Sequence, residues 1–226
     1  MIGIVGGHGK TGRWVAAGLA ARGVDAVALG RADWDQLAGA LAGCGAAYLI
    51  APNLHPDEPA YVAEALAALG AAGVPRVVYH SVASPYAPAM PHHVGKAVSE
   101  DLVRRSGLAW TILQPGVYVQ NFDLTRPVSV PYDVHARFGF LDLADLGEAA
   151  ATVLTEDGHD GATYELASRQ CSVAELAAEA GTVAERVDAT DAPEGLRAMF
   201  AYYDAHGLPA GTLTLRALLG RASAGH

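Results

Sequence analysis

Short apolar runs alternate with longer helical patterns through the first half of the chain. Such runs, bounded by glycine or polar residues, are typical of strands buried on both faces of a parallel sheet. Right-handed crossovers through the intervening Ala- and Leu-rich segments would stack these strands in one sheet. The pattern predicts an α/β fold with a doubly wound, mostly parallel Rossmann sheet. We expect its strands near Ile2 to Val5, Ala26 to Leu29, Ala46 to Ala51, Arg76 to Ser81 and Trp110 to Leu113.

Two of the intervening helices have clear end signals. One begins near Asp57, a residue type that caps helix N-termini, and Gly73 lies past its end. The other is expected from about His92 to Ser106 and stops at Gly107. Between Arg31 and Ala46 there is room for one helix, near Asp35 to Leu41, but little room for a further strand. We therefore expect a sheet that is shortened by about one strand near its edge.

The regular alternation fades after Gln114. We expect residues 1–120 to form the Rossmann core, and residues 121–226 to form a small C-terminal α+β region on the substrate side, packed on the core as a single structural unit. This region would form a lid or wall over the open end of the sheet, where such folds bind ligands. Its expected strands are Phe138 to Leu141 and Ala162 to Leu166, and its expected helices are Ala144 to Leu154 and Ser172 to Ala180.

Composition limits the partners of the chain. Its 226 residues are 51% hydrophobic, which supports a buried core, and 15 Lys and Arg against 24 Asp and Glu give a formal charge of −9. That charge argues against nucleic acid and anionic membranes as partners. The first strand begins at once, without a leader pattern, so a cytoplasmic location is expected, as a monomer or homodimer. Cys44 and Cys171 lack paired-ligand spacing, so we expect no metal site and no disulfide.

A glycine-rich turn follows the first apolar run. Gly6, Gly9 and Gly12 stand three residues apart, just before a helical pattern. Gly6 would permit the tight turn, Gly9 would let the backbone approach a pyrophosphate, and Gly12 would let the helix pack on the sheet. The N–H groups that open the helix favour an anion. We therefore predict a dinucleotide here, although a purely structural strand–turn–helix would also match.

Basic residues near this turn indicate which dinucleotide to expect. NAD-preferring proteins usually place Asp or Glu at the end of the second strand, but here that position is Arg31. A guanidinium can hold a ribose phosphate with two parallel donors, and Arg13 is a second candidate. NADP(H) is therefore the expected cofactor, with His8, Lys10 and Thr11 of the turn as further contacts. A solvated strand end would be the alternative explanation of Arg31.

Three further features occur in order between residues 77 and 121. They are the strand end Tyr79-His80-Ser81, a helix bearing Lys96 and Glu100, and Thr111-Ile112-Leu113-Gln114-Pro115-Gly116 followed by Asn121. Together with the glycine turn, they resemble the NmrA-like branch of the atypical short-chain dehydrogenase/reductase superfamily. The resemblance covers most of residues 1–125 and implies an NADP(H)-binding fold. It also implies that Lys96 hydrogen-bonds the nicotinamide ribose and that Pro115 lies near the carboxamide.

The same resemblance shows that the usual proton relay is missing. Typical members have a Tyr four residues before this Lys and a Ser beyond the preceding strand. His92 takes the Tyr position and Val82 the Ser position, with Ser81 and Ser84 on either side. On a helix, His92 would share a face with the Lys four residues later. His92 is therefore the first candidate for the catalytic role of the Tyr, although His92 and His93 could instead only cap or line the helix start. A nearby ammonium lowers the pKa of an imidazole, so His92 should be neutral at pH 7: a poor acid that can still donate one hydrogen bond.

Other candidates carry weaker signals. Tyr86, in the loop before that helix, is a second candidate proton donor, and Asn53, at a strand end, is a candidate contact to cofactor ribose. Ser81 is counted with the cofactor contacts, and Lys96 with both the cofactor-binding and the catalytic residues. Two residue pairs have structural explanations that compete with a functional one. Asp142 and Asp145 fit a helix start better than a catalytic pair, and Tyr202 and Tyr203 would line either the substrate wall or the core.

The combined interpretation is an enzyme. We expect an NADPH-dependent oxidoreductase that transfers hydride to a small conjugated carbonyl or quinone-type substrate without the usual Tyr/Ser relay. Two alternatives stay open: an NADP(H)-sensing regulatory protein without turnover, and a redox-neutral biosynthetic enzyme on the same fold. An enzyme should hold a sizeable pocket beside the nicotinamide, whereas a sensor would have that space filled.

Overall fold

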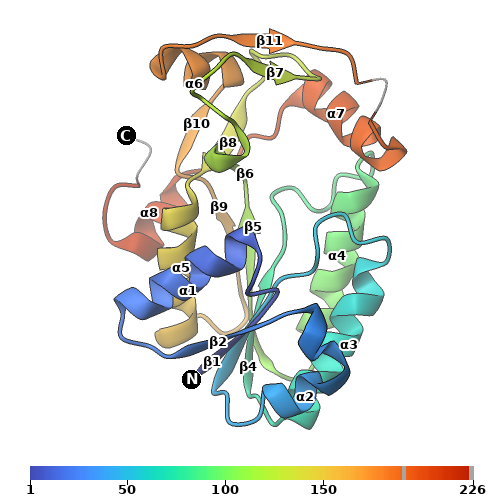
Figure 1. Ribbon diagram of the computed structural model, residues 1–226, viewed down its shortest axis with the longest axis vertical. Coiled ribbons are helices and arrows are strands. Elements are labelled where there is room, and N and C mark those ends of the chain that lie inside the picture. The colour runs from blue at the N-terminus through green and yellow to red at the C-terminus, as the bar shows by residue number, and fades with distance from the viewer. Residues whose placement is uncertain (190–191, 224–226) are drawn as a thin grey trace.

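A central parallel sheet organises the chain in a computed structural model, which describes residues 1–189 and 192–223. Its strand order is β2-β1-β3-β4-β5-β9, and every neighbouring pair is parallel (Figure 1). This confirms the predicted α/β Rossmann sheet, because strands buried on both faces must be joined by crossover helices. The strands are β1 (Ile2–Val5), β2 (Ala26–Leu29), β3 (Ala46–Leu49), β4 (Arg76–His80), β5 (Ala109–Pro115) and β9 (Ala162–Leu166).

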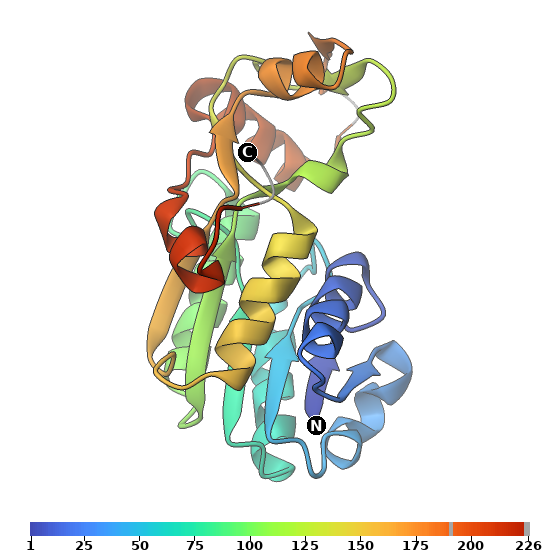
Figure 2. The same cartoon turned by 90° about the vertical axis from the view of Figure 1, so that its left-hand side faces the viewer.

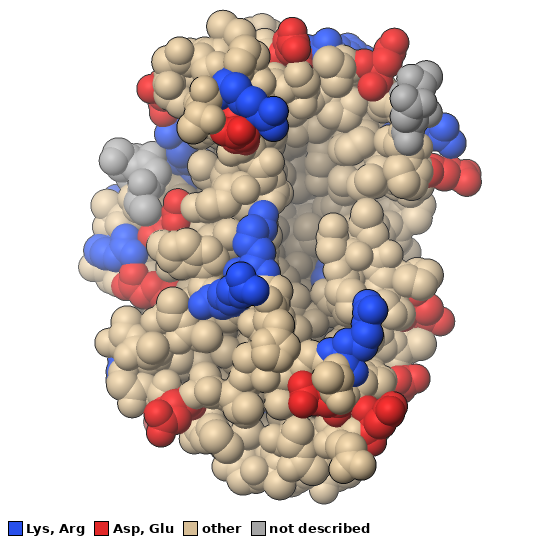
Figure 3. All heavy atoms as spheres, viewed as in Figure 1, with Lys and Arg blue, Asp and Glu red and all other residues tan. Residues whose placement is uncertain are grey.

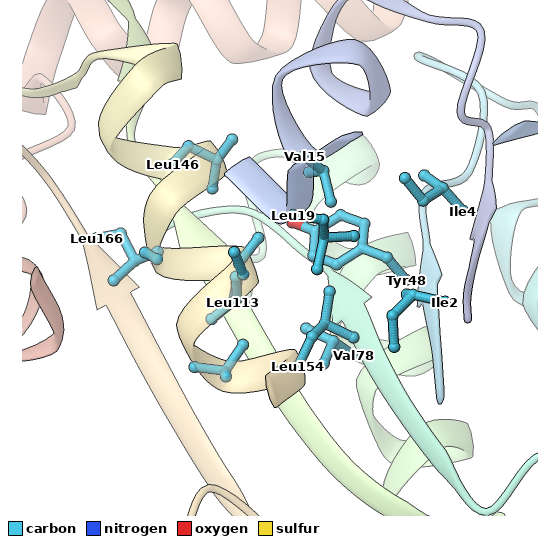
Figure 4. Close-up of a cluster of buried hydrophobic side chains, with 14 of the residues drawn as sticks. Ile2, Ile4, Val15, Leu19, Tyr48, Val78, Leu113, Leu146, Leu154 and Leu166 are labelled. Carbon is cyan, nitrogen blue, oxygen red and sulfur yellow. The ribbon is translucent and has the colours of Figure 1, made fainter. Parts of the chain in front are cut away.

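Helices cover both faces of this sheet. On one face, α1 (Lys10–Ala21) and α5 (Leu143–Thr155) lie side by side (Figure 2), and α8 (Leu213–Leu219) adds Leu215 to their core. Val15, Leu19 and Leu146 pack there against strand residues (Figure 4). The other face carries α2 (Leu37–Ala40), α3 (Glu58–Ala71) and α4 (Pro91–Arg104). The predicted cap of α3 is confirmed, since the Asp57 side chain accepts a hydrogen bond from the Ala60 N–H at 3.0 Å.

The sheet ends at β2, as the short second unit predicted. A 3-10 helix (Arg31–Gln36) and the single turn of α2 lead directly from β2 to β3. The expected helix near residues 35–41 is present as α2 with the end of the 3-10 helix before it, and the connection has no room for another strand. The end of β2 consequently stays accessible beside the glycine turn.

The C-terminal half builds a second layer above the carboxyl ends of the strands (Figure 1). Two small sheets, β10-β8-β6 and β11-β7, pack with two helices around an aromatic core that includes Tyr132, Phe138 and Tyr203. Their elements are β6 (Val117–Tyr118), β7 (Val128–Val130), β8 (Phe138–Leu141), β10 (Arg169–Cys171), β11 (Ala184–Arg186), α6 (Val173–Glu179) and α7 (Glu194–His206), with a 3-10 turn at Val119–Asn121.

The two layers do not separate at residue 120. From the expected C-terminal region, β9 pairs with β5 in the central sheet and α5 covers one face of that sheet. The helix expected from Ser172 is present as α6 and begins with a capping box, in which the Ser172 hydroxyl accepts from the Glu175 N–H at 3.1 Å. Cys44 and Cys171 are both buried free thiols. Among residues 1–189 and 192–223, no helix is long and apolar enough to span a bilayer, and no metal-ligating cluster occurs.

Candidate functional site

The glycine turn has the geometry that its spacing predicted. Gly6 has φ +82°, a backbone conformation that side chains rarely allow. A Cβ added at Gly12 would lie 2.6 Å from Gly7 Cα, so the start of α1 approaches the turn as closely as only glycine permits. The N-cap of α1 is Gly9, and no side chain accepts hydrogen bonds from the first N–H groups of the helix. These donors therefore face the space above the sheet.

A cavity of about 1190 Å³ opens at this turn. It runs between the two layers, where Figure 3 shows a hollow with Lys and Arg side chains on both sides. The cavity brings together most of the residues predicted from the sequence, although they come from widely separated parts of the chain. The predicted residues that line it are Gly6, His8, Gly9, Lys10, Thr11, Gly12, Arg31, Asn53, Ser81, His92, Lys96 and Pro115.

Two predicted residues do not line this cavity. Arg13 lies on α1 with an exposed side chain. Tyr86 is 64% exposed, donates a hydrogen bond to Glu100 at 3.2 Å and accepts one from Arg104 at 3.3 Å. These contacts hold its hydroxyl away from the cavity, so the assignment of Tyr86 as a proton donor is not supported.

Aromatic residues form the cavity end nearest to Arg31. Trp34 stacks on Tyr61 with ring centroids 4.2 Å apart, and its indole Nε1 donates to Glu64 Oε2 at 3.1 Å. All four residues line the cavity, and Arg31 is exposed. Sequence analysis missed Trp34, Tyr61 and Glu64, because nothing in the local pattern shows that the turn after β2 meets α3.

Lys10 crosses the cavity from the glycine turn. Its Nζ donates to Asn121 Oδ1 at 2.6 Å and lies 5.7 Å from the centre of the Tyr118 ring. The Tyr118 hydroxyl lies 2.7 Å from Nε2 of His80, whose Nδ1 is 2.7 Å from the Tyr48 hydroxyl. Burial, followed by the charge of Lys96, lowers the pKa of His80 to about 3. A neutral imidazole therefore links the two tyrosines at neutral pH.

Lys96 is held in the cavity wall by buried partners. Its Nζ lies 2.7 Å from Glu58 Oε1 and donates to the carbonyl of His80 at 3.1 Å. Tyr79 donates a hydrogen bond to the same Glu58 oxygen at 2.7 Å. Sequence analysis missed Glu58. An acidic residue in the first turn of a helix is favourable in itself, so the position of Glu58 in α3 gave no sign of a functional role.

Ser81 reaches the cavity, but its hydroxyl is already used. It donates to Glu100 Oε1 at 2.5 Å, and Gln114 donates to the same oxygen at 2.7 Å. Val82, which the family resemblance predicts at the position of the relay serine, also lines the cavity and has no hydroxyl. No serine hydroxyl is thus free to assist proton transfer beside Lys96 in the part of the chain that the structure describes.

His92 and His93 both line the cavity from the start of α4. Burial lowers the pKa of His92, the charge of Lys96 lowers it further, and Glu58 opposes the effect. The sequence-based argument named the ammonium as the cause, but burial is the larger one. His93 is 1% exposed, its Nδ1 lies 3.2 Å from the Ser84 carbonyl oxygen, and burial lowers its pKa to about 4. Both imidazoles are therefore neutral at pH 7.

An apolar wall closes the far end of the cavity. Tyr132, Met199, Phe200 and Tyr203 contribute to it, and Tyr203 packs edge-on against Tyr132. Tyr203 thus serves both the wall and the core, whereas Tyr202 packs on His206 and does not line the cavity.

The two aspartates at the start of α5 have structural roles. The Asp142 side chain caps the helix by accepting from the Ala144 N–H at 2.7 Å. Asp145 is fully buried and accepts from Arg221 at 3.0 Å. They do not form a catalytic pair.

The chain is similar in sequence to two oxidoreductases. The NAD(P)H azoreductase of Xenophilus azovorans is 30% identical over 177 residues, which cover 74% of this chain and 61% of that protein. Quinone oxidoreductase 2 of Escherichia coli (strain K12) is 29% identical over 175 residues, 73% of this chain and 60% of that protein. The matched part thus spans about three fifths of the length of these relatives.

Solved structures share the fold across nearly the whole chain. An NADPH-dependent quinone oxidoreductase from Escherichia coli, complexed with NADPH, superposes with a TM-score of 0.79 and 23% identity, covering 99% of this chain and 96% of that one. The triphenylmethane reductase of Citrobacter sp., complexed with NADP(H), gives a TM-score of 0.77 and 21% identity, covering 98% and 96%. At such identities the likeness supports the fold alone.

The sequence profile of the NmrA-like family matches residues 8–195, from within the glycine turn to the first residues of α7. Because this match includes every strand of the central sheet except β1, most of the cavity lining and much of the second layer, the chain belongs to the NmrA-like family.

Proposed function

We propose that the cavity binds NADP(H) with its pyrophosphate at the glycine turn. A Cβ at Gly6, Gly7 or Gly12 would clash with neighbouring backbone, so only glycine lets the turn take this tight shape. The uncapped start of α1 then offers N–H donors to an anion, which fits a pyrophosphate. Lys10 adds a positive charge at the same place. His8, Gly9 and Thr11 would supply further contacts along the turn.

Arg31 supports the phosphorylated form of the cofactor. Its exposed side chain lines the cavity where β2 ends, the position at which an acidic residue would favour NAD(H). Guanidinium groups bind phosphate through parallel donors. The adenosine half would then lie toward Arg31, and the nicotinamide half toward Asn53, Lys96 and Pro115. The name of one relative, an NAD(P)H azoreductase, agrees with a nicotinamide dinucleotide as cofactor.

We further propose that the chain is an NADPH-dependent reductase of small conjugated carbonyl or quinone-type compounds. The observation that carries this proposal is the continuity of the cavity from the glycine turn to the apolar wall. Its volume of about 1190 Å³ exceeds the ~300–1,000 Å³ of a typical pocket for one small ligand, which leaves space beside a cofactor. Tyr132, Met199 and Phe200 would contact a flat apolar acceptor there.

The side chains of the cavity favour acceptors that need little help with protons. NADPH, when bound, supplies the hydride. Lys96 would orient the ligand as a fixed donor, while neutral His92 can donate one hydrogen bond but is a poor acid. Val82 offers no donor, and the Ser81 hydroxyl is bonded to Glu100. Quinones and conjugated acceptors, whose reduced forms need little proton assistance, suit such a site better than simple ketones.

The test is to measure binding of NADPH and NADH, and then NADPH oxidation with matched quinones, azo dyes, enones and simple ketones. We expect NADPH to bind more tightly than NADH, and quinones or conjugated acceptors to react fastest. Equal rates with simple ketones would contradict the proposed substrate class. Tight NADPH binding without turnover on any acceptor would instead favour the sensor, against which the open cavity argues.

A further inference from the structure

We propose that Glu58 is a positioning residue that fixes the Lys96 ammonium in the cavity wall and neutralises its charge beside the nicotinamide half of the cofactor. This inference rests on the proposed binding of NADP(H). Glu58 is the first residue of α3 and does not itself line the cavity. Its role would therefore be exerted through Lys96.

The pair is held from several directions in the interior. Glu58 is 3% exposed and Lys96 is 6% exposed. Besides the 2.7 Å contact between them, Tyr79 donates to the same carboxylate oxygen at 2.7 Å, and the ammonium lies 5.6 Å from the centre of the Tyr79 ring. Residues from α3, β4 and α4 thus meet at one point, which restricts where the ammonium can lie.

The hydrogen bonds of Lys96 leave one donor for a ligand. An ammonium has three N–H groups. Glu58 Oε1 and the His80 carbonyl oxygen accept two of them, and within residues 1–189 and 192–223 no third acceptor is present. Because Lys96 lines the cavity, the remaining N–H is available on that side.

Burying a charged pair such as Glu58 and Lys96 costs free energy. Burying two charges removes their hydration, and a well-packed apolar pair of similar size is often as stable or more stable. The second oxygen of Glu58, Oε2, is buried and has no hydrogen-bond partner among the described residues. The cost of desolvating this carboxylate is therefore only partly offset by hydrogen bonds. A requirement for Lys96 at the cavity wall explains why the fold keeps both charges.

The charge of Glu58 acts on groups in the cavity. The carboxylate raises the pKa of His92, whereas Lys96 lowers it, so the two charges oppose each other at a cavity residue. An oxidised nicotinamide is positively charged and a reduced one is neutral. Glu58 should therefore stabilise NADP⁺ relative to NADPH, and Lys96 should do the opposite.

The test compares the dissociation constants of NADP⁺ and NADPH, measured by calorimetry together with the melting temperature of each variant. In Glu58→Gln, the ratio of the NADP⁺ constant to the NADPH constant should rise by roughly tenfold, as expected for an unbalanced charge at moderate effective dielectric. In Lys96→Met, the ratio should fall. The double variant Glu58→Gln/Lys96→Met should return it toward the parent value, and Glu58→Asp should stay close to the parent.

A merely structural role would change both constants alike. Asp101→Asn is the matched control, because Asp101 lies on the same helix as Lys96 but is exposed and does not line the cavity, so the ratio should not move. Equal losses for both nucleotides in Glu58→Gln and Lys96→Met would overturn the inference while leaving the proposed function intact. If the parent protein bound neither nucleotide, the proposed function would fail and this inference with it. If Glu58→Gln does not fold, the comparison of Lys96→Met with the double variant still decides, because these two differ only at Glu58: a ratio that is the same in both would overturn the inference.

Discussion

Lowering the pH from 7 to 5 should destabilise this protein through two buried histidines. Burial lowers the pKa of His93 to about 4 and that of His80 to about 3, against 6.5 in an unfolded chain. Between these values the unfolded state binds more protons than the folded state, so the free energy of unfolding falls as the pH falls. The contribution of each histidine is complete above pH 6.5 and is lost progressively below it.

The size of the effect follows from the same values. For a histidine that titrates at 6.5 when unfolded and at about 4 when folded, linkage gives a loss of about 2 kcal/mol between pH 7 and pH 5. His80 adds a loss of similar size, about 2 kcal/mol. The sum is a large part of the ~5–15 kcal/mol that stabilises a typical domain.

Urea unfolding at both pH values measures this loss. His93→Leu removes one titrating group, so the variant should lose about 2 kcal/mol less than the parent between pH 7 and pH 5, whatever its stability at pH 7. His135→Gln, at an exposed position, is the control and should leave the pH dependence unchanged. If His93→Leu lost as much stability as the parent, the reasoning from burial would be refuted.

Three further predictions concern packing, the cofactor and a helix cap. Gly18→Ala should destabilise the fold by about 1–3 kcal/mol, because the new Cβ would clash with the Gly147 carbonyl. Gly70→Ala, with open space around the new Cβ, should instead stabilise the fold by up to ~1 kcal/mol, and thermal unfolding compares the two variants. Arg31→Ala should weaken NADPH much more than NADH in a binding titration, and an equal loss would refute its contact with the 2′-phosphate. Asp57→Ala should cost about 1 kcal/mol in urea unfolding, and an unchanged midpoint would show that the cap of α3 is dispensable.

Local patterns predicted the elements that depend on local physics. The apolar runs located β1 and β2 to the residue, and the absence of room after Arg31 predicted the shortened sheet. Ends were less accurate, since β5 extends from Ala109 to Pro115 rather than from 110 to 113. Pairing with neighbours on both sides, including β9 from far along the chain, extends that strand.

In the candidate site too, the residues that depend on local backbone geometry were predictable, and those that depend on tertiary contacts were not. Residues in the glycine turn were predictable, because a positive φ and a close approach of backbone permit little besides glycine. Tyr86 was misjudged because its loop turns the hydroxyl to Glu100 and Arg104. Tyr118 was overlooked because its partner His80 is 38 residues away in the sequence. Glu58 was overlooked because its partner Lys96 lies on another helix.

The sequence by itself determined the α/β sheet, the glycine turn at the start of α1 and the presence of His92 and Val82, rather than Tyr and Ser, where the family resemblance predicts a proton relay. These depend on hydrophobic period, backbone sterics and residue identity, all of which are local. Only the tertiary structure decided which polar groups meet. It pairs Lys96 with Glu58 and places His80 between two tyrosines, because desolvated charges and donors must find partners wherever the packed chain brings them.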